Sequence, residues 1–290
     1  MDYHEEVILF LTRMSVAALA AEYKKAEDAY RNGTPLMTDL QFDQLEDKLR
    51  KAAPHHPHLQ GDGVVMLGLR KNRRESFNEW YMQLPEKPIM VVQPKIDGIA
   101  IGLRYVDGKL AEAQTRKGRC AMELIESVHS IPKQLKRQAP GVVEIHGELW
   151  GLPKDSQDSR TPQSIAAVSA RFNRVSGSGL MFCAYRLKLW PELRFGALTN
   201  ESQAMEDLRR HGFDVPDTIV CTKPSEVCKL YKQWREGHVS ERQPFNTKLF
   251  KSWPTDGVVA KVFDQKLQRK LGAGFECPNW AIALKNNGIA

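Results

Sequence analysis

One stretch of this sequence decides the fold: MVVQPKIDGIAIGLRYVDG, residues 90–108. It opens with a short apolar run at 90–93 and continues with apolar side chains at alternate positions from Ile99 to Tyr105. The pair Asp107-Gly108 then turns the chain into residues 110–115, and a DG pair between alternating segments is a strong signal for a β-hairpin. The stretch therefore predicts a short buried strand followed by two antiparallel strands.

The residues after this hairpin continue the mixture of strands and helices. Apolar and β-branched runs predict further strands, and apolar residues at helical spacing predict helices. An α+β body with antiparallel strands follows. The predicted strands cover 142–149, 180–187, 257–262 and 280–284, and the predicted helices cover 204–211 and 225–234.

The residues before the hairpin predict a small helical domain. Ser15 caps a first predicted helix that ends near Gly33, and Thr38 with Gln41 forms a capping box for a second helix that stops at Pro54. Proline, glycine and histidine dominate from there to about residue 74, which is typical of a linker. The predicted domains are thus 1–60, helical, and 61–290, built on antiparallel sheet.

Composition narrows the class of protein. The 290 residues carry a net charge of +7, which suits a polyanionic partner. No apolar run approaches the roughly 20 residues that a membrane span needs, and the acidic N-terminus lacks a secretion signal, so we expect a cytoplasmic protein without membrane contact. Five cysteines without a CxxC pair argue against a disulfide framework or a four-cysteine zinc module.

The segment Lys95-Ile96-Asp97-Gly98 lies where a predicted strand ends, so the scaffold holds Lys95 while its amine stays free. An amine attacks only after losing its proton, which for an ordinary lysine costs about 4 kcal/mol at neutral pH. Nearby cations or partial burial would reduce that cost. The sequence supplies cations at Arg116, Lys261 and Lys285. Taken alone, however, KIDG also fits an ordinary surface turn.

Four later segments favour the nucleophile over the turn, because they follow in order and each lies on a predicted strand or its end. With the lysine segment, they resemble the covalent nucleotidyltransferases, and within these the bacterial NAD⁺-dependent DNA ligases. The resemblance runs from about residue 9 to residue 285. The segments are EIHGE at 144–148, 180–185, DGVVAKV at 256–262 and WAIALK at 280–285.

The resemblance implies an antiparallel-sheet nucleotidyltransferase domain, ATP-grasp-like as in ligase adenylation domains, and it implies a role for each matched residue. Lys95 would be the nucleophile toward NAD⁺, and Lys261 and Lys285 would neutralise charge on the α-phosphate. Tyr185 would stack on adenine, although core packing is its alternative, and Asp256 would contact the cofactor or form only a turn. The remaining roles are Arg116 at the sugar-phosphate, and Glu148 with Asp97 at the ribose and a hydrated Mg²⁺.

The N-terminal helices resemble the small domain that binds the nicotinamide mononucleotide half of NAD⁺, with Tyr30, Asp39 and Asp43 at its contact positions. Some positions depart from the family. Gln93 stands where a glutamate commonly reads the adenine amino group, and His146 replaces an arginine. The loop that carries a cofactor-binding arginine is reduced to residues 165–171, which makes Arg171 the candidate.

The family implies nicked double-stranded DNA as the partner. Relatives continue beyond the position of Lys285 into an OB-fold, so we expect self-adenylation with little nick sealing by this chain alone, and a second subunit carrying an OB-fold as a possible partner. Two alternatives stay open. One is an ATP- or GTP-dependent ligase or capping enzyme, and the other is a nucleotide-binding module that has lost catalysis.

Overall fold

The computed structural model describes residues 14–31, 36–52, 66–72, 76–116, 118–137, 141–152, 161–172, 179–190, 198–237, 245–274 and 277–285. The chain divides into two compact units, Met1–Val65 and Met66–Ala290. The predicted boundary after residue 60 falls among residues that lie outside the described ones, so it stays a prediction.

The first unit is the predicted pair of helices, α2 (Val16–Arg31) and α3 (Asp39–Ala52). Ser15 Oγ accepts from the Ala18 N–H at 3.3 Å, and Thr38 exchanges hydrogen bonds with Gln41 in both directions, which confirms both caps. Leu45 and Leu49 are buried against α2 on one face of α3. The predicted ends near Gly33 and at Pro54 lie outside the described residues.

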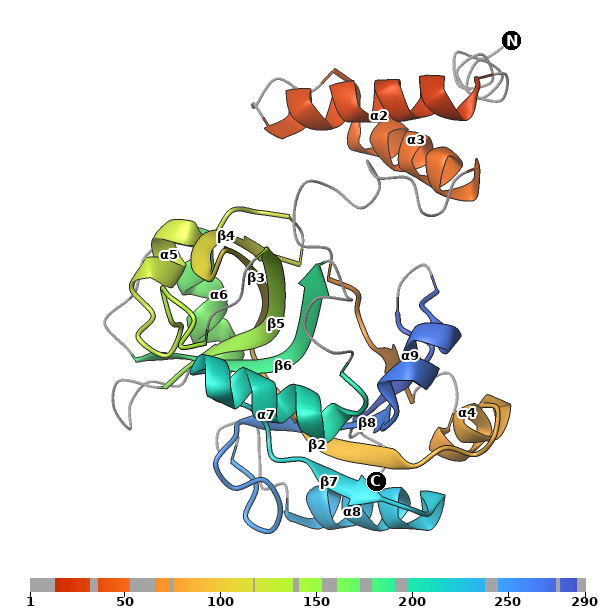
Figure 1. Ribbon diagram of the computed structural model, residues 1–290, viewed down its shortest axis with the longest axis vertical. Helices are drawn as coiled ribbons and strands as arrows, with labels where there is room; N and C mark the ends of the chain where they lie inside the picture. The colour runs from red at the N-terminus through yellow and green to blue at the C-terminus, as the bar shows by residue number, and fades with distance from the viewer. Residues whose placement is uncertain are drawn as a thin grey trace. The chain divides into compact units, whose positions relative to one another are not determined.

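The second unit holds two sheets that are mostly antiparallel (Figure 1). One has the order β1-β9-β8-β2-β7 and the other β4-β3-β5-β6. The mixed, antiparallel-rich α+β class is therefore confirmed. The strands are β1 (Arg70–Lys71), β2 (Met90–Ile96), β3 (Ile99–Val106), β4 (Lys109–Thr115), β5 (Val142–Gly151), β6 (Leu180–Trp190), β7 (Ile219–Cys221), β8 (Thr255–Val262) and β9 (Ala281–Lys285).

Each sheet has its own apolar core. The core of the β4-β3-β5-β6 sheet includes Leu103, Ile145 and Phe182, all fully or almost fully buried, and the other core centres on Trp234 and Val258. Helices complete both cores by burying their apolar faces. These helices are α4 (Phe77–Gln83), α5 (Met122–Glu126), α6 (Pro162–Phe172), α7 (Glu201–His211), α8 (Pro224–Gly237) and α9 (Gln265–Leu271).

The chain passes from one sheet to the other at Asp97-Gly98, between β2 and β3. The Asp97 N–H donates to the Pro254 carbonyl at 2.9 Å. A Cβ on Gly98 would lie 2.3 Å from the Leu149 carbonyl oxygen and 2.9 Å from Glu148 Cγ, so only glycine lets the chain pass this close to β5. The predicted hairpin turn is confirmed, with φ positive at both Asp107 and Gly108.

Some elements differ from the expectation. Residues 70–71 were predicted as linker, but they form β1, which obtains its hydrogen bonds from distant β9. The predicted cofactor loop at 165–171 is part of helix α6. Helix α4 was missed although Ser76 and Glu79 form a capping box that the sequence shows. Also unpredicted were α5, α9 and the three-residue strand β7.

Candidate active site

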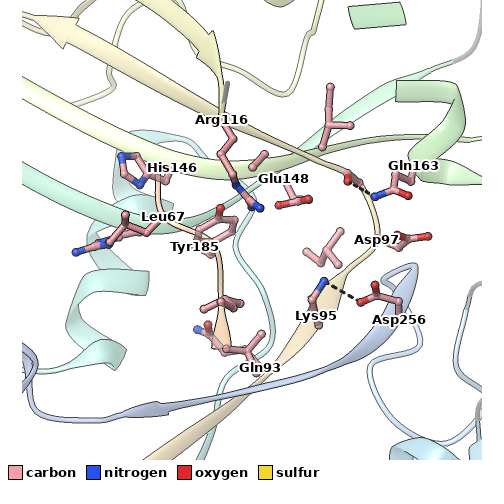
Figure 2. A pocket seen from close by; sticks show the side chains of 18 of the residues that line it. Leu67, Gln93, Lys95, Asp97, Arg116, His146, Glu148, Gln163, Tyr185 and Asp256 are labelled. Carbon is pink, nitrogen blue, oxygen red and sulfur yellow. Dashed lines mark hydrogen bonds and ion pairs between the residues drawn. The ribbon is translucent and has the colours of Figure 1, made fainter. Parts of the chain in front are cut away.

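The two sheets face each other across a cavity of about 710 Å³ (Figure 2). Strands from both sheets line it, so residues far apart in the sequence meet there. The cavity gathers nine of the residues predicted for the site. These are Gln93, Lys95, Asp97, Arg116, Glu148, Tyr185, Asp256, Lys261 and Lys285.

Lys95 and Lys285 share one carboxylate. Lys95 Nζ lies 2.9 Å from Asp256 Oδ1 as an ion pair, without the angle of a hydrogen bond, and Lys285 Nζ donates to Asp256 Oδ2. The strand register explains the arrangement, because Gly257 of β8 pairs with Lys95 on one side and with Lys285 on the other. Asp256 therefore holds two amines at the same end of the cavity.

Glu148 and Asp97 both line the cavity, and Figure 2 shows Glu148 between Arg116 and Asp97. Burial raises the pKa of Glu148 to about 7, against the opposing charges of Lys95 and Arg116. A cation placed beside this carboxyl group would stabilise its ionised form and lower its pKa. In the described part of the chain, no cluster of three or more His, Cys, Asp or Glu side chains could hold a metal ion.

We expect Glu148→Gln to become more stable relative to the wild type as the pH rises. In the unfolded chain Glu148 ionises at its ordinary pKa of 4.5, but in the folded protein it ionises only near pH 7. Between these two values the unfolded state gains from ionisation and the folded state does not, so the wild type loses stability as the pH rises. The relative gain reaches at most about 3 kcal/mol above pH 7. Urea unfolding of metal-free, nucleotide-free protein at pH 5 and pH 8 measures it.

The matched control for this experiment is Glu206→Gln, which changes an exposed carboxylate on α7. Its stability difference from the wild type is expected to vary little over the same pH range. A Glu148→Gln difference that is equally independent of pH would contradict the predicted burial of this carboxyl group.

Lys261 is buried among polar groups. Its Nζ donates to the Tyr185 carbonyl at 3.1 Å and lies 3.5 Å from Glu201 Oε2, with 7% and 4% of the Lys261 and Glu201 side chains exposed. Glu201 is held by Gln265 and Gln268, whose amides donate to its Oε1. Burial lowers the pKa of Lys261, and Glu201 acts in the opposite direction.

The aromatic and basic residues on β6 form another wall of the cavity. Burial raises the pKa of the Tyr185 hydroxyl, so it stays neutral, and Figure 2 shows Arg116 extending toward this ring. The Arg186 guanidinium lies 5.0 Å from the ring centre of Trp280, the residue directly before β9 of the other sheet. His146 is 3% exposed with no hydrogen-bond partner for Nε2, so this atom is available to a ligand or a water.

Four residues predicted for the site have side chains that the structure does not describe. Tyr30, Asp39 and Asp43 lie in helices α2 and α3 of the first unit, and Arg171 lies in α6. The side chains of these four are outside the described ones, so their roles stay predictions. The sequence reasoning gave neither Arg186 nor Trp280 a role in the site, although Arg186 follows Tyr185 and Trp280 opens the matched segment 280–285.

No helix in the described part of the chain is long and apolar enough to cross a membrane. The lysine amine, the further cations and the three carboxylates around this cavity include the groups that a lysine-dependent nucleotidyltransferase requires. The model of the family "NAD-dependent DNA ligase adenylation domain" matches residues 69–159 and 162–288. The chain belongs to this family.

Curated relatives agree with that assignment. A DNA ligase of Roseobacter denitrificans is 27% identical over 94% of this chain and 44% of the relative. A DNA ligase of Thermotoga petrophila is 31% identical over 87% of this chain and 41% of the relative. The chain thus spans less than half the length of these relatives.

Among solved structures, the ATP-dependent DNA ligase of bacteriophage T7 in complex with ATP is similar to this chain. It has a TM-score of 0.40 and 10% identity over 73% of this chain and 65% of that one. A TM-score of this size is too low to bear on function.

Proposed function

We propose that the chain is the adenylation module of an NAD⁺-dependent DNA ligase. Lys95 attacks the α-phosphate of NAD⁺, forms lysyl-AMP and releases nicotinamide mononucleotide. The observation that carries the proposal is the gathering of Lys95, Lys261, Lys285 and Glu148 around one cavity. Three of these four residues are lysines, and their positive charges suit a substrate that carries two phosphates.

In the proposed reaction a phosphorus–nitrogen bond forms at Lys95 as the bond to the leaving phosphate breaks. The amine must first lose a proton, and Asp256 Oδ1 at 2.9 Å is a carboxylate within reach of it. Lys261, Lys285 and Arg116 neutralise the charge that develops on the phosphoryl oxygens. Because β2, β8 and β9 are neighbours in one sheet, the amines are in place before the substrate arrives.

The rest of the substrate is assigned to the other walls. Tyr185 stacks on adenine, Gln93 meets its amino group, and Glu148 binds the ribose hydroxyls. Arg171 is proposed to contact the cofactor as well. Tyr30, Asp39 and Asp43 of the first unit are proposed to bind the nicotinamide mononucleotide half.

Magnesium fits the carboxylates present. Mg²⁺ keeps most of its waters and binds through one or two carboxylates together with substrate phosphates, and Glu148 and Asp97 offer two such groups on the cavity wall. The pKa of about 7 for Glu148 supports this choice, since a nearby cation stabilises its ionised form. When bound, the metal would neutralise phosphate charge.

The later steps are further proposals. AMP would pass from Lys95 to the 5′-phosphate of nicked double-stranded DNA, for which the net charge of +7 is favourable. A second subunit carrying an OB-fold would help to grip the duplex, and a cytoplasmic setting fits this task. Incubating adenylated protein with nicked duplex, with and without such a subunit, and detecting 5′-adenylated DNA tests the transfer.

Intact-mass measurement tests the first step. After incubation with NAD⁺ and Mg²⁺ we expect a gain of one adenylyl group, and after incubation with ATP and Mg²⁺ no gain. NAD⁺ is favoured because the family match covers almost all of the second unit. An adduct from ATP alone would remove the NAD⁺ assignment, and no adduct from either would remove the proposed reaction.

A further inference from the structure

The side-chain amide of Gln93 lies in the cavity wall and is held by a hydrogen bond at one end. Gln93 is 1% exposed, and its Nε2 donates to Thr218 Oγ1 at 2.9 Å. The strand register holds the two residues together, because Val92 of β2 pairs with Ile219 of β7. Gln93 and the neighbouring Pro216 both line the cavity.

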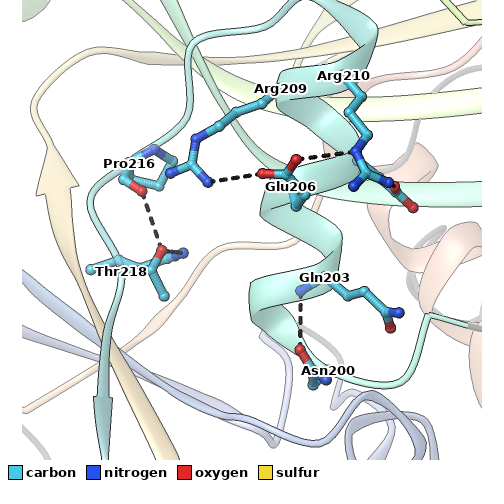
Figure 3. Close-up of polar contacts among 9 residues, drawn as sticks. Asn200, Gln203, Glu206, Arg209, Arg210, Pro216 and Thr218 are labelled. Atoms are coloured by element: carbon cyan, nitrogen blue, oxygen red, sulfur yellow. Dashed lines mark hydrogen bonds and ion pairs between the residues drawn. The ribbon is translucent and has the colours of Figure 1, made fainter.

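The chemistry of Thr218 decides which end of the amide faces it. Its hydroxyl has one proton, which it donates to the Pro216 carbonyl oxygen at 3.2 Å (Figure 3). A carbonyl oxygen can only accept, so the hydroxyl is left to accept from Gln93. The NH₂ end of the amide must therefore face Thr218, which leaves Oε1 as the end for a ligand. If the amide turned over, two acceptors would compete for a single hydroxyl proton.

We propose that Thr218 determines the base specificity of the site by holding Gln93 as a hydrogen-bond acceptor toward the 6-position of the purine. A glutamine that rotates freely accepts from the amino group of adenine and donates equally well to the carbonyl of hypoxanthine. A fixed one accepts only, as a carboxylate does, and leaves the hypoxanthine carbonyl facing an oxygen. Thr218 thereby gives Gln93 the behaviour of the glutamate that the family commonly has at this position.

The inference rests on the proposed function and goes beyond it, since it concerns the choice between bases. The test compares NAD⁺ with nicotinamide hypoxanthine dinucleotide, which has a carbonyl in place of the amino group at the 6-position of the purine and a proton on the adjacent N1. The rate of adduct formation is measured by intact mass with each dinucleotide, and their ratio is the readout. The ratio is taken within one protein, so a partial loss of folded protein cancels.

The wild type is expected to prefer NAD⁺. Thr218→Val removes both the acceptor and the donor while keeping the side-chain shape, so the amide can turn and the preference falls about tenfold. Thr218→Ser is the matched control, because it keeps the hydroxyl and the preference. In a Gln93→Glu background, Thr218→Val is expected to leave the ratio unchanged, since a carboxylate has no donor end to turn.

Two results would overturn the inference. One is a Thr218→Val protein that prefers NAD⁺ as strongly as the wild type, and the other is a wild type that reacts equally with both dinucleotides. If Thr218→Val forms no adduct, its base preference is measured instead by comparing the shifts in melting temperature that AMP and IMP cause. A wild type that forms an adduct with neither dinucleotide removes the proposed function instead, so the two failures are distinguishable.

Discussion

Lys95→Ala is expected to form no adenylyl adduct with NAD⁺, at any concentration that labels the wild type fully. The amine of Lys95 is the proposed attacking atom, and a methyl group in its place has no lone pair with which to form the phosphorus–nitrogen bond. Intact mass of the purified variant, after incubation with NAD⁺ and Mg²⁺, measures the loss.

A second substitution separates nucleophilicity from charge. Lys95→Arg keeps a cation beside Asp256 Oδ1, but a guanidinium cannot be deprotonated in a protein and so cannot attack. We expect it to bind nucleotide and still form no adduct. Lys266→Ala, on the exposed face of α9, is the control and is expected to react as the wild type does. An adduct on Lys95→Ala would show that another residue is the nucleophile.

The largest effect on stability is expected for Glu201→Gln. This substitution leaves Lys261 buried without its carboxylate partner, and breaking one side of a buried ion pair typically costs about 3–5 kcal/mol. The position of Glu201 in the first turn of α7, where the helix dipole favours a negative charge, adds to the loss. The free energy of unfolding in urea is the measurement.

Glu206→Gln on the same helix is the matched control. Glu206 is exposed and pairs with Arg209 and Arg210 on the surface (Figure 3), so its loss should change the unfolding free energy by about 0.5 kcal/mol or less. Adding Lys261→Met to Glu201→Gln should recover much of the stability, because no buried charge remains. Equal effects of Glu201→Gln and Glu206→Gln would contradict a buried, interacting pair.

Local patterns predicted most of the sheet elements and both helices of the first unit. They succeeded where the signal lies in neighbouring residues, as at the Asp107-Gly108 turn and the cap of Thr38 and Gln41. Helix α4 was missed despite its local capping box, but strand β1 was missed because it depends on a distant partner. Strand β1 is only two residues long, and its pairing with Ile282 and Ala283 bridges about 200 residues of sequence.

In the candidate site, too, some residues could be predicted from the sequence and others could not. Motif spacing and family resemblance selected the nine cavity residues, because the chemistry of phosphoryl transfer restricts which side chains can serve. The partners that orient them were not predicted. Glu201 and Thr218 belong to no matched motif, and they reach Lys261 and Gln93 only through the packing of α7 and β7.

The sequence by itself predicted Lys95 as the nucleophile and the chemistry it would perform, and it determined the hairpin that begins beside Lys95, because each of these depends on residue type and short spacing. Only the tertiary structure decided that Asp256 joins two lysines, that Glu201 accompanies Lys261 and that Thr218 orients Gln93. Hydrogen bonds and ion pairs act over about 3–4 Å, so they exist only after the chain has brought distant strands into register.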